Sequence, residues 1–371
     1  MDTTLFLSLG NIIDSALTGN PKKVKAYARQ LVDYLDELGE AEAASRIRSS
    51  VNGNRASKAS ISRAIQSVPK PIPVDHDSRF PLADEEIITS PVGIVFPENI
   101  QFTINRWIDS IRQADRLLEH GIEVPSTLLM HGPPGCGKSL LARYLAAELD
   151  LPLLTARSDA LISSFLGSTS KNVRSLFDHV QNRPCILFLD EFDAIAKMRD
   201  DQREMGELKR VVISLLQNID TLAGNTILLA ATNHEHLLDP AVWRRFSTTI
   251  QIPLPSVQVR KSMLVNYFCG LVDEEVIFTL ADLTEGMSGA QLKDLAQDAI
   301  RETILSGGSH VMPSTAFRVA AERITDGGAL TTSDALRAVR DALGKSITQA
   351  RLGEMFELSQ SQVSRILRCA E

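Results

Sequence analysis

A glycine-rich segment of eight residues is the first feature of the sequence that could do chemistry. It fits the pattern G-x-x-x-x-G-K-[ST] and consists of Gly132, Pro133, Pro134, Gly135, Cys136, Gly137, Lys138 and Ser139. An apolar run expected to be a strand precedes it at Leu128–His131, and an expected helix follows at Leu140–Leu149. Glycines let backbone N–H groups turn toward phosphate oxygens, and a helix N-terminus adds partial positive charge. With Lys138 at the β- and γ-phosphates and Ser139 on Mg²⁺, the segment predicts an ATP site.

Two carboxylates end a strongly apolar run further along the chain. Cys185–Leu189 predicts a buried strand, and Asp190 and Glu191 follow it directly. Asp190 at the strand tip would hold Mg²⁺ through water, and Glu191 is placed to polarise the attacking water. Asp193 fits either a further role in the site or the cap of the next helix. Together with the glycine-rich segment, these acids predict that the protein hydrolyses ATP.

The elements that would position these residues alternate between short apolar runs and longer amphipathic stretches. The runs expected to be strands are Thr127–Met130, Leu151–Leu154, Cys185–Leu189, Thr226–Ala230 and Thr248–Ile252. Strands that alternate with helices predict an α/β fold with a parallel sheet covered by helices on both faces. After Pro255 the chain becomes helical again, through Val257–Cys269, Asp273–Leu280 and Gly289–Leu305.

Both ends of the chain are expected to be helical. After Pro21, apolar residues recur at steps of three and four, which predicts a small helical domain. The basic stretch Arg46–Lys70 contains no acidic residue and fits either a solvated linker or an arm that contacts phosphates. We expect a helical N-terminal domain (1–52), a linker (53–89), an α/β subdomain (90–256), a helical lid (257–328) and a C-terminal helical segment (329–371).

The composition indicates a globular protein in the cytoplasm. Of 371 residues, 44% are hydrophobic and 23% are charged, as in ordinary globular chains. The net charge of −7 argues against a surface devoted as a whole to nucleic acid. No apolar run is long enough for a membrane span. The four cysteines lack CxxC spacing, which favours free thiols in a reducing compartment.

Four motifs in order resemble the ATPase module of the AAA family. They are GPPGCGKS, ILFLDEFDAI, LLAATN and LLDPAVWRRF, and the resemblance covers roughly residues 90–310. The motifs are similar to those of the branch that includes katanin, spastin and the motor domains of membrane proteases. The resemblance implies a P-loop AAA+ fold with a helical lid, ATP and Mg²⁺ as cofactors, and assembly into a homo-oligomeric ring, most often a hexamer.

Three catalytic residues are implied by this resemblance. Asn233 matches sensor 1, a polar residue at a strand tip that positions the attacking water. Arg244 and Arg245 match the arginines that reach the γ-phosphate of a neighbouring subunit, where charge spreads during hydrolysis. Outside this context, paired arginines would be expected to form surface ion pairs.

The lid is expected to touch the nucleotide. Gly289 and Ala290 match a turn that in the family lies against the nucleotide base. Gln291 stands where the family usually has an acid, and no basic sensor-2 residue is evident.

A short triplet implies a grip on a protein substrate. In the family, an aromatic–hydrophobic–glycine triplet lines the pore of the ring, and the matching residues are Phe165, Leu166 and Gly167. A core phenylalanine is the alternative. The acids that usually follow are replaced by Ser168–Ser170, and Met198–Met205 fits either a second pore loop or a solvated loop.

The C-terminal residues Leu352–Leu367 read as helix, tight turn and helix, with Ser359 capping the second helix. This hairpin resembles the helix-turn-helix of bacterial DNA-binding proteins. The residues that would contact DNA are Gln360, Ser361, Gln362, Ser364 and Arg365. The alternative is a surface for protein contacts, because Glu357 stands where glycine is usual and the segment is only weakly basic.

Two functions therefore remain open. In the first, a ring-forming ATPase remodels or threads a protein substrate, with a partner protein such as a protease. In the second, ATP regulates a DNA-binding protein that is anchored by the C-terminal hairpin.

Overall fold

The computed structural model describes residues 71–75, 78–90, 92–161, 166–181, 183–196, 205–222, 225–325, 328–344 and 347–368, together with Leu31. The chain divides into two compact units, Met1–Gln66 and Ser67–Glu371, and the elements below belong to the second. Leu31 apart, the expected N-terminal domain lies outside the described residues. So do the basic stretch Arg46–Lys70, the pore residue Phe165 and most of the expected second pore loop.

A six-stranded sheet forms the centre of the α/β region, in the order β1-β3-β4-β5-β2-β6. The strands are β1 (Ala83–Glu86), β2 (Thr127–His131), β3 (Leu153–Ala156), β4 (Cys185–Leu189), β5 (Thr226–Thr232) and β6 (Thr248–Gln251). β1 pairs antiparallel to β3, and the other four pairings are parallel. Every residue of β4 and β5 is buried, because helices cover both faces of central parallel strands. The sheet confirms the expected α/β fold class.

The first strand corrects the expected boundary of the linker at residue 90. Leu82 and Ala83 are fully buried, and Ala83 lies opposite Ala156 in the ladder with β3. This segment was expected to be part of the linker, but it forms an edge strand in which Glu85 pairs with Arg183 and Glu86 with Arg143. Glu86 accepts two hydrogen bonds from the Arg143 guanidinium, at 2.7 and 2.8 Å. The α/β subdomain therefore begins before β1.

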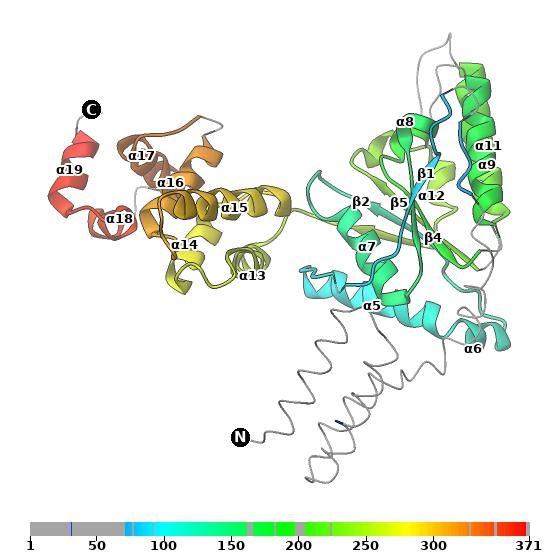
Figure 1. The fold of residues 1–371 in the computed structure, drawn as a ribbon, viewed down its shortest axis with the longest axis horizontal. Helices are drawn as coiled ribbons and strands as arrows, with labels where there is room; N and C mark the ends of the chain where they lie inside the picture. Colours follow the sequence, from blue (N-terminus) through cyan, green and yellow to red (C-terminus); the bar gives the residue numbers. More distant parts are fainter. Residues whose placement is uncertain are drawn as a thin grey trace. The chain divides into compact units, whose positions relative to one another are not determined.

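Helices cover the two faces of the sheet. Figure 1 shows α5 (Glu98–Arg112) and α7 (Lys138–Leu149) on one side and α9 (Leu166–Val180) and α11 (Met205–Asp220) on the other. The buried residues of α5 recur at steps of three and four, which gives the helix one apolar face. The shorter helices are α6 (Ala114–Glu119), α8 (Ser158–Leu161), α10 (Asp193–Ala196), the 3-10 helix η2 (Glu235–Leu237) and α12 (Pro240–Trp243).

The helices after Pro255 share one apolar core that runs from Val259 to Val363. They are α13 (Val257–Phe268), α14 (Glu274–Leu283), α15 (Gly289–Leu305), α16 (Pro313–Ile324), α17 (Thr332–Leu343), α18 (Gln349–Phe356) and α19 (Gln360–Arg368). Phe356 of α18 packs against Phe317 of α16, with ring centroids 6.4 Å apart. The expected boundary at residue 329 therefore does not separate two cores. None of the described helices is long and apolar enough to cross a membrane.

Candidate active site

The glycine-rich segment joins β2 to α7 as a tight loop. Gly132 has φ of 140°, and a Cβ there would lie 2.1 Å from the carbonyl oxygen of Ile252. Gly135 has φ of 72°, and its Cβ would lie 2.7 Å from Ser288 Oγ. Both positions require glycine on conformational and steric grounds. No side chain caps the N-terminus of α7, which leaves its first backbone N–H groups available to an anion.

The Lys138 ammonium lies over this loop. It donates hydrogen bonds to the carbonyl oxygens of Gly132 (2.7 Å) and Pro133 (2.8 Å), and the residue is only 6% exposed. Burial lowers the pKa of Lys138, while Asp190 and Asp193 act in the opposite direction. Because an ammonium has three donors, one remains for a phosphate oxygen.

The two predicted acids follow β4 and have different surroundings. Asp190 accepts a hydrogen bond from the Ser139 hydroxyl (2.8 Å), so the two expected Mg²⁺ ligands lie side by side. Glu191 is exposed and has φ of 49°, a strained conformation for a residue with a side chain. The next residue, Phe192, is fully buried, and its N–H donates to Ala231 O (2.8 Å). This anchor fixes the backbone on the C-terminal side of Glu191, and the Glu191 N–H donates to Asp190 Oδ1 (2.9 Å) on the other side.

The tip of β5 brings a buried polar oxygen to the same edge of the sheet. Asn233 Oδ1 is buried and accepts no hydrogen bond from any residue that the structure describes. An unpaired buried acceptor is costly, so this oxygen fits a water or a ligand donor. The neighbouring Thr232 hydroxyl donates to Asp193 Oδ1 (2.7 Å) and accepts from the N–H of His234 (3.0 Å). Asp193 thus ties α10 to the tip of β5.

The N-terminus of α15 meets the glycine-rich loop. The Ala290 N–H donates to Gly135 O (3.0 Å), which places the expected lid turn against the loop. Ser288 caps the helix, and its N–H donates to the Gln291 side chain (2.8 Å) in a capping box. Gln291 can replace an acid here because either side chain completes this motif.

These features fit a nucleoside triphosphate with Mg²⁺. The glycine loop, the open helix N-terminus and Lys138 offer donors to phosphates, and Asn233 Oδ1 lacks a donor. The described residues contain no group of three His, Cys, Asp or Glu side chains that could enclose a metal ion. Ser139 and Asp190 suit Mg²⁺ nonetheless, because this ion usually takes few protein ligands together with phosphate and water.

Comparison with known proteins identifies the family. Residues 128–254 match the AAA family, the ATPase family associated with various cellular activities. An uncharacterized AAA family ATPase of Sinorhizobium fredii is 37% identical over 254 residues, which are 67% of this chain and 70% of that protein. The chain belongs to the AAA family of ATPases.

More distant members of the family match a smaller part of the chain. A proteasome-activating nucleotidase of Thermococcus onnurineus is 35% identical over 53% of this chain and 53% of its own length. The 26S proteasome regulatory subunit 10B homolog A of Arabidopsis thaliana is 36% identical over 49% of this chain and 48% of its own. The chain therefore spans about half the length of these relatives.

As an AAA ATPase the chain hydrolyses ATP, and its two candidate arginines have different surroundings. Both follow α12, whose first turn is capped by the Asp239 carboxylate on the Ala241 N–H (2.7 Å). Arg244 is exposed, and its side chain makes no hydrogen bond or ion pair within the described part of the chain. Arg245 is half-buried and pairs with Asp220 at the end of α11.

The AAA ATPase also contains a contact that the sequence motifs did not predict. His131, directly before the glycine-rich loop, contacts the Glu235 carboxylate and lies edge-on to Trp243, with ring centroids 5.3 Å apart. It joins the end of β2 to η2 and α12. In the sequence, only its position next to Gly132 indicated that His131 belongs to the site. No neighbouring residue indicated that its partners are Glu235 and Trp243.

The pore triplet is described in part, and the C-terminal hairpin is present. Leu166 and Gly167 lie in the first turn of α9. At the hairpin, α18 ends at Phe356, Glu357 adopts the left-handed conformation with φ of 55°, and the hydroxyl of Ser359 accepts from the Gln362 N–H (3.3 Å). Of the five candidate DNA contacts, Ser364 is half-buried and the other four are exposed.

Proposed function

We propose that this AAA ATPase is a ring-forming motor that uses ATP hydrolysis to remodel or thread a protein substrate. One observation supports the ring most directly: the side chain of Arg244 is exposed, follows α12, and has no hydrogen bond or ion pair with the described residues of its own chain. Charge that spreads over a γ-phosphate during hydrolysis is commonly met by an arginine supplied in trans. A ring places such an arginine at each site, and a hexamer is the expected number by family resemblance.

The relatives favour a protein substrate. Two of them are named for the proteasome, a nucleotidase that activates it and a regulatory subunit of it. We extend this to a partner protease for the present chain, and to Phe165 as the residue that grips the substrate. The motifs also favour the branch of katanin, spastin and the membrane-protease motors, in which the same ring geometry is expected.

In this mechanism some residues bind the phosphates of ATP and others activate the attacking water. Lys138 and the N-terminus of α7 hold the phosphates, while the oxygen of Asn233 orients a water that Glu191 deprotonates. When bound at Ser139 and Asp190, Mg²⁺ neutralises charge on the phosphate oxygens. The turn at Gly289 and Ala290 closes on the nucleotide from the lid.

The test is ATP-dependent unfolding of a fluorescent protein that carries an unstructured tail. The full-length chain should abolish its fluorescence only with ATP, and Glu191→Gln should bind the substrate without unfolding it. Phe165→Ala should hydrolyse ATP but not unfold. Unfolding by Phe165→Ala at the wild-type rate would remove the pore role. No ATP-dependent unfolding with any tail tested would contradict the motor itself.

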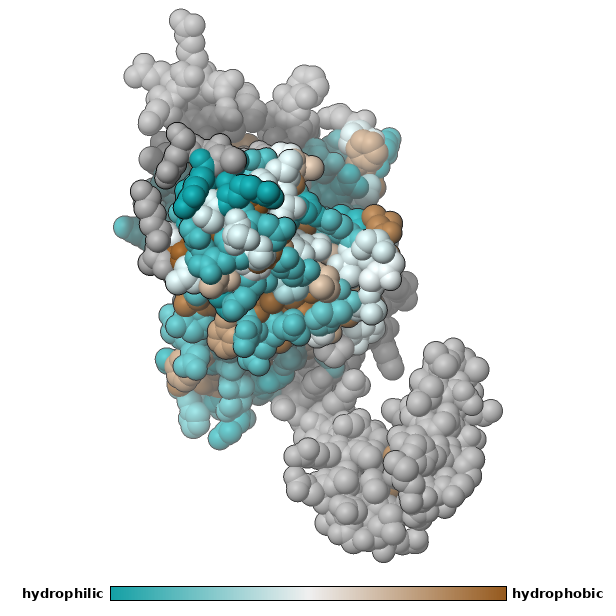
Figure 2. Space-filling view, turned by 90° about the vertical axis from the view of Figure 1, so that its left-hand side faces the viewer, coloured by the Kyte–Doolittle hydropathy of each residue, from teal (hydrophilic) through white to brown (hydrophobic). Residues whose placement is uncertain are grey.

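A second candidate function is contact with duplex DNA through α19. The hairpin has the capped turn that this mode of binding needs, and the side chains of Gln360 and Arg365 make no hydrogen bond with the described residues. Seen from the side that carries α18 and α19 in Figure 1, the surface is mostly hydrophilic and its apolar residues form separate patches (Figure 2). Such a surface suits a polar partner. Gln362 is partly committed, since its side chain accepts from the Ser359 N–H (2.8 Å).

The DNA reading is tested with point variants, because deletion of residues 329–371 would remove part of the shared core. Fluorescence anisotropy should show salt-sensitive binding by the full-length chain. Arg365→Ala should weaken it and reduce the slope of affinity against salt by about one phosphate contact. Arg340→Ala on α17 is the control. Equal binding by both variants would exclude α19 as the anchor, and no binding at low salt would leave the hairpin as a protein-docking surface.

A further inference from the structure

We infer that the two adjacent arginines have different tasks. Arg244 extends toward the neighbouring subunit, whereas Arg245 is a positioning residue that Asp220 of its own subunit holds in place. The inference rests on the proposed ring, and it assigns to Arg245 and Asp220 a role in the geometry of the inter-subunit contact.

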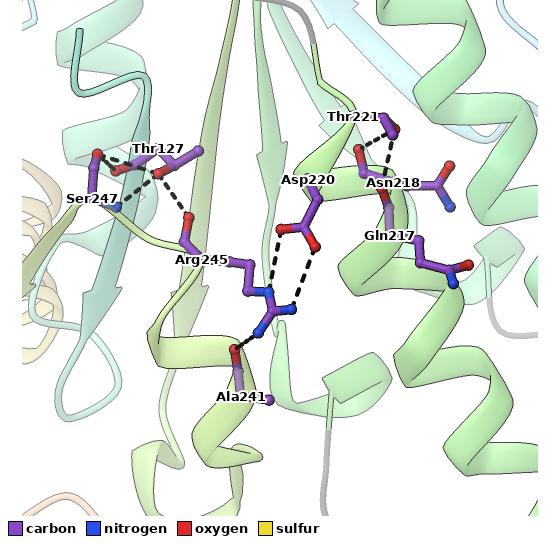
Figure 3. A network of polar contacts seen from close by, with 8 residues as sticks. All are labelled: Thr127, Gln217, Asn218, Asp220, Thr221, Ala241, Arg245 and Ser247. Carbon is purple, nitrogen blue, oxygen red and sulfur yellow. Dashed lines mark hydrogen bonds and ion pairs between the residues drawn. The ribbon is translucent and has the colours of Figure 1, made fainter. Parts of the chain in front are cut away.

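The guanidinium of Arg245 is occupied on three sides within its own chain (Figure 3). Its Nε and Nη2 donate to the two carboxylate oxygens of Asp220, at 3.2 and 3.4 Å, in a bidentate pair. Its Nη1 donates to the carbonyl oxygen of Ala241 at 3.1 Å. Arg245 would have to give up all three bonds before it could reach the phosphate of another subunit.

The backbone at Arg245 is fixed as well (Figure 3). Its carbonyl oxygen accepts from the Thr127 hydroxyl (3.0 Å), at the start of the strand that leads to the glycine-rich loop. Ser247 exchanges two further bonds with Thr127, both of 2.8 Å. Between them, Phe246 is buried edge-on against Phe192, with centroids 5.7 Å apart. The segment after α12 is thus held to β2 and to the residue that follows Glu191.

Asp220, the partner of Arg245, lies at a helix C-terminus, where a nearby cation is stabilising. Asp220 is the last residue of α11, and a carboxylate at a helix C-terminus meets the negative end of the helix dipole. The Arg245 guanidinium offsets that charge. Arg244 belongs to the same turn, but it is exposed and has no partner among the described residues. The ion pair therefore fixes the turn from which Arg244 projects.

A double-mutant cycle on the full-length chain tests the division. The variants are Arg244→Ala, Asp220→Asn, Arg245→Gln, Arg245→Lys and the double variant Asp220→Asn/Arg245→Gln, with Arg340→Ala as control. Arg244→Ala should lower kcat by about 10³-fold, the effect of losing a trans arginine. Asp220→Asn, Arg245→Gln and Arg245→Lys should each lower kcat by about tenfold, because Arg244 is then misplaced. The double variant should have the same kcat as the single variants, because all of them break one ion pair. The Kd for ATP should not change.

Lysine at 245 separates the two roles, because it keeps the charge but cannot form the bidentate pair. The inference is overturned if Arg245→Gln falls as far as Arg244→Ala while Asp220→Asn keeps wild-type kcat. It is also overturned if Asp220→Asn lowers only the melting temperature, since the pair would then be merely structural. A wild-type kcat in Arg244→Ala would instead contradict the proposed ring, whatever kcat is measured for Asp220→Asn.

Discussion

At the scale of single residues, the loop after β2 and the acids after β4 have different roles that single substitutions can separate. In the proposed mechanism Lys138 binds the phosphates of ATP, whereas Glu191 activates the attacking water. Lys138→Ala should weaken ATP binding by roughly 10- to 100-fold, the loss expected for a charge-assisted hydrogen bond. Glu191→Gln should keep the wild-type Kd and lower kcat by about 10²- to 10⁴-fold. Calorimetry and phosphate release measure the two effects. Normal turnover in Glu191→Gln would show that another group is the base.

The cysteines differ in burial and should therefore differ in reactivity. Burial raises the pKa of Cys185 to about 12 and raises that of Cys136 as well. A raised pKa leaves less thiolate at pH 8, and thiolate is the form that reacts. Iodoacetamide at pH 8, followed by mass mapping, should label the exposed Cys269 before the buried Cys136 and Cys185. Labelling of Cys185 in the native protein as fast as in urea would contradict this burial.

Sequence patterns predicted the residues of the site that belong to local motifs. The phosphate loop, Asp190 and Glu191 could be predicted as candidate site residues because each lies next to the strand that positions it. The contacts of His131 with Trp243 and of Thr232 with Asp193 were not, because they join segments that only the folded sheet brings together.

Among the elements, the C-terminal hairpin depends on a close approach between α18 and the turn that follows it. A Cβ on Gly353 would lie 2.5 Å from the carbonyl oxygen of Leu358, a backbone atom that cannot move freely. Helix propensity alone predicts that Gly353→Ala stabilises α18 by about 1 kcal/mol. The clash should outweigh it and destabilise the protein by roughly 1–3 kcal/mol.

Thermal unfolding of the full-length chain measures this effect. Gly93→Ala is the control, since a Cβ at Gly93 has no atom within 4 Å. A melting temperature that rises in Gly353→Ala would show that α18 and the turn at Leu358 do not approach as described.

Element boundaries were predicted best where the apolar pattern was continuous. Each of the five apolar runs that were expected to be strands contains a strand of the sheet, and α15 has the expected bounds. The strand β1 was missed because Ala83–Glu86 contains three acids and lacks the apolar run that indicated the other strands. The end of the lid was misplaced because packing, which brings Phe356 onto Phe317, decides where a core ends.

At the scale of the whole molecule, ATP should drive assembly. Arg244 has no partner within the described part of its own chain, so binding of ATP by one subunit gives it a target on the next. Analytical ultracentrifugation of Glu191→Gln should show a large oligomer with ATP and smaller species without it. A monomer at saturating ATP would remove the ring.

The most direct test of the account mixes two inactive proteins. Glu191→Gln lacks the proposed catalytic carboxylate but keeps Arg244, and Arg244→Ala keeps the carboxylate but lacks the arginine. If each site is built from two subunits, co-assembled rings contain some complete sites, about a quarter of them at equal mixing in a head-to-tail ring. We expect phosphate release from the mixture to reach that fraction of wild-type activity, while each protein alone stays near zero. Mixed rings that co-purify yet hydrolyse no more ATP than the separate proteins would contradict the shared site.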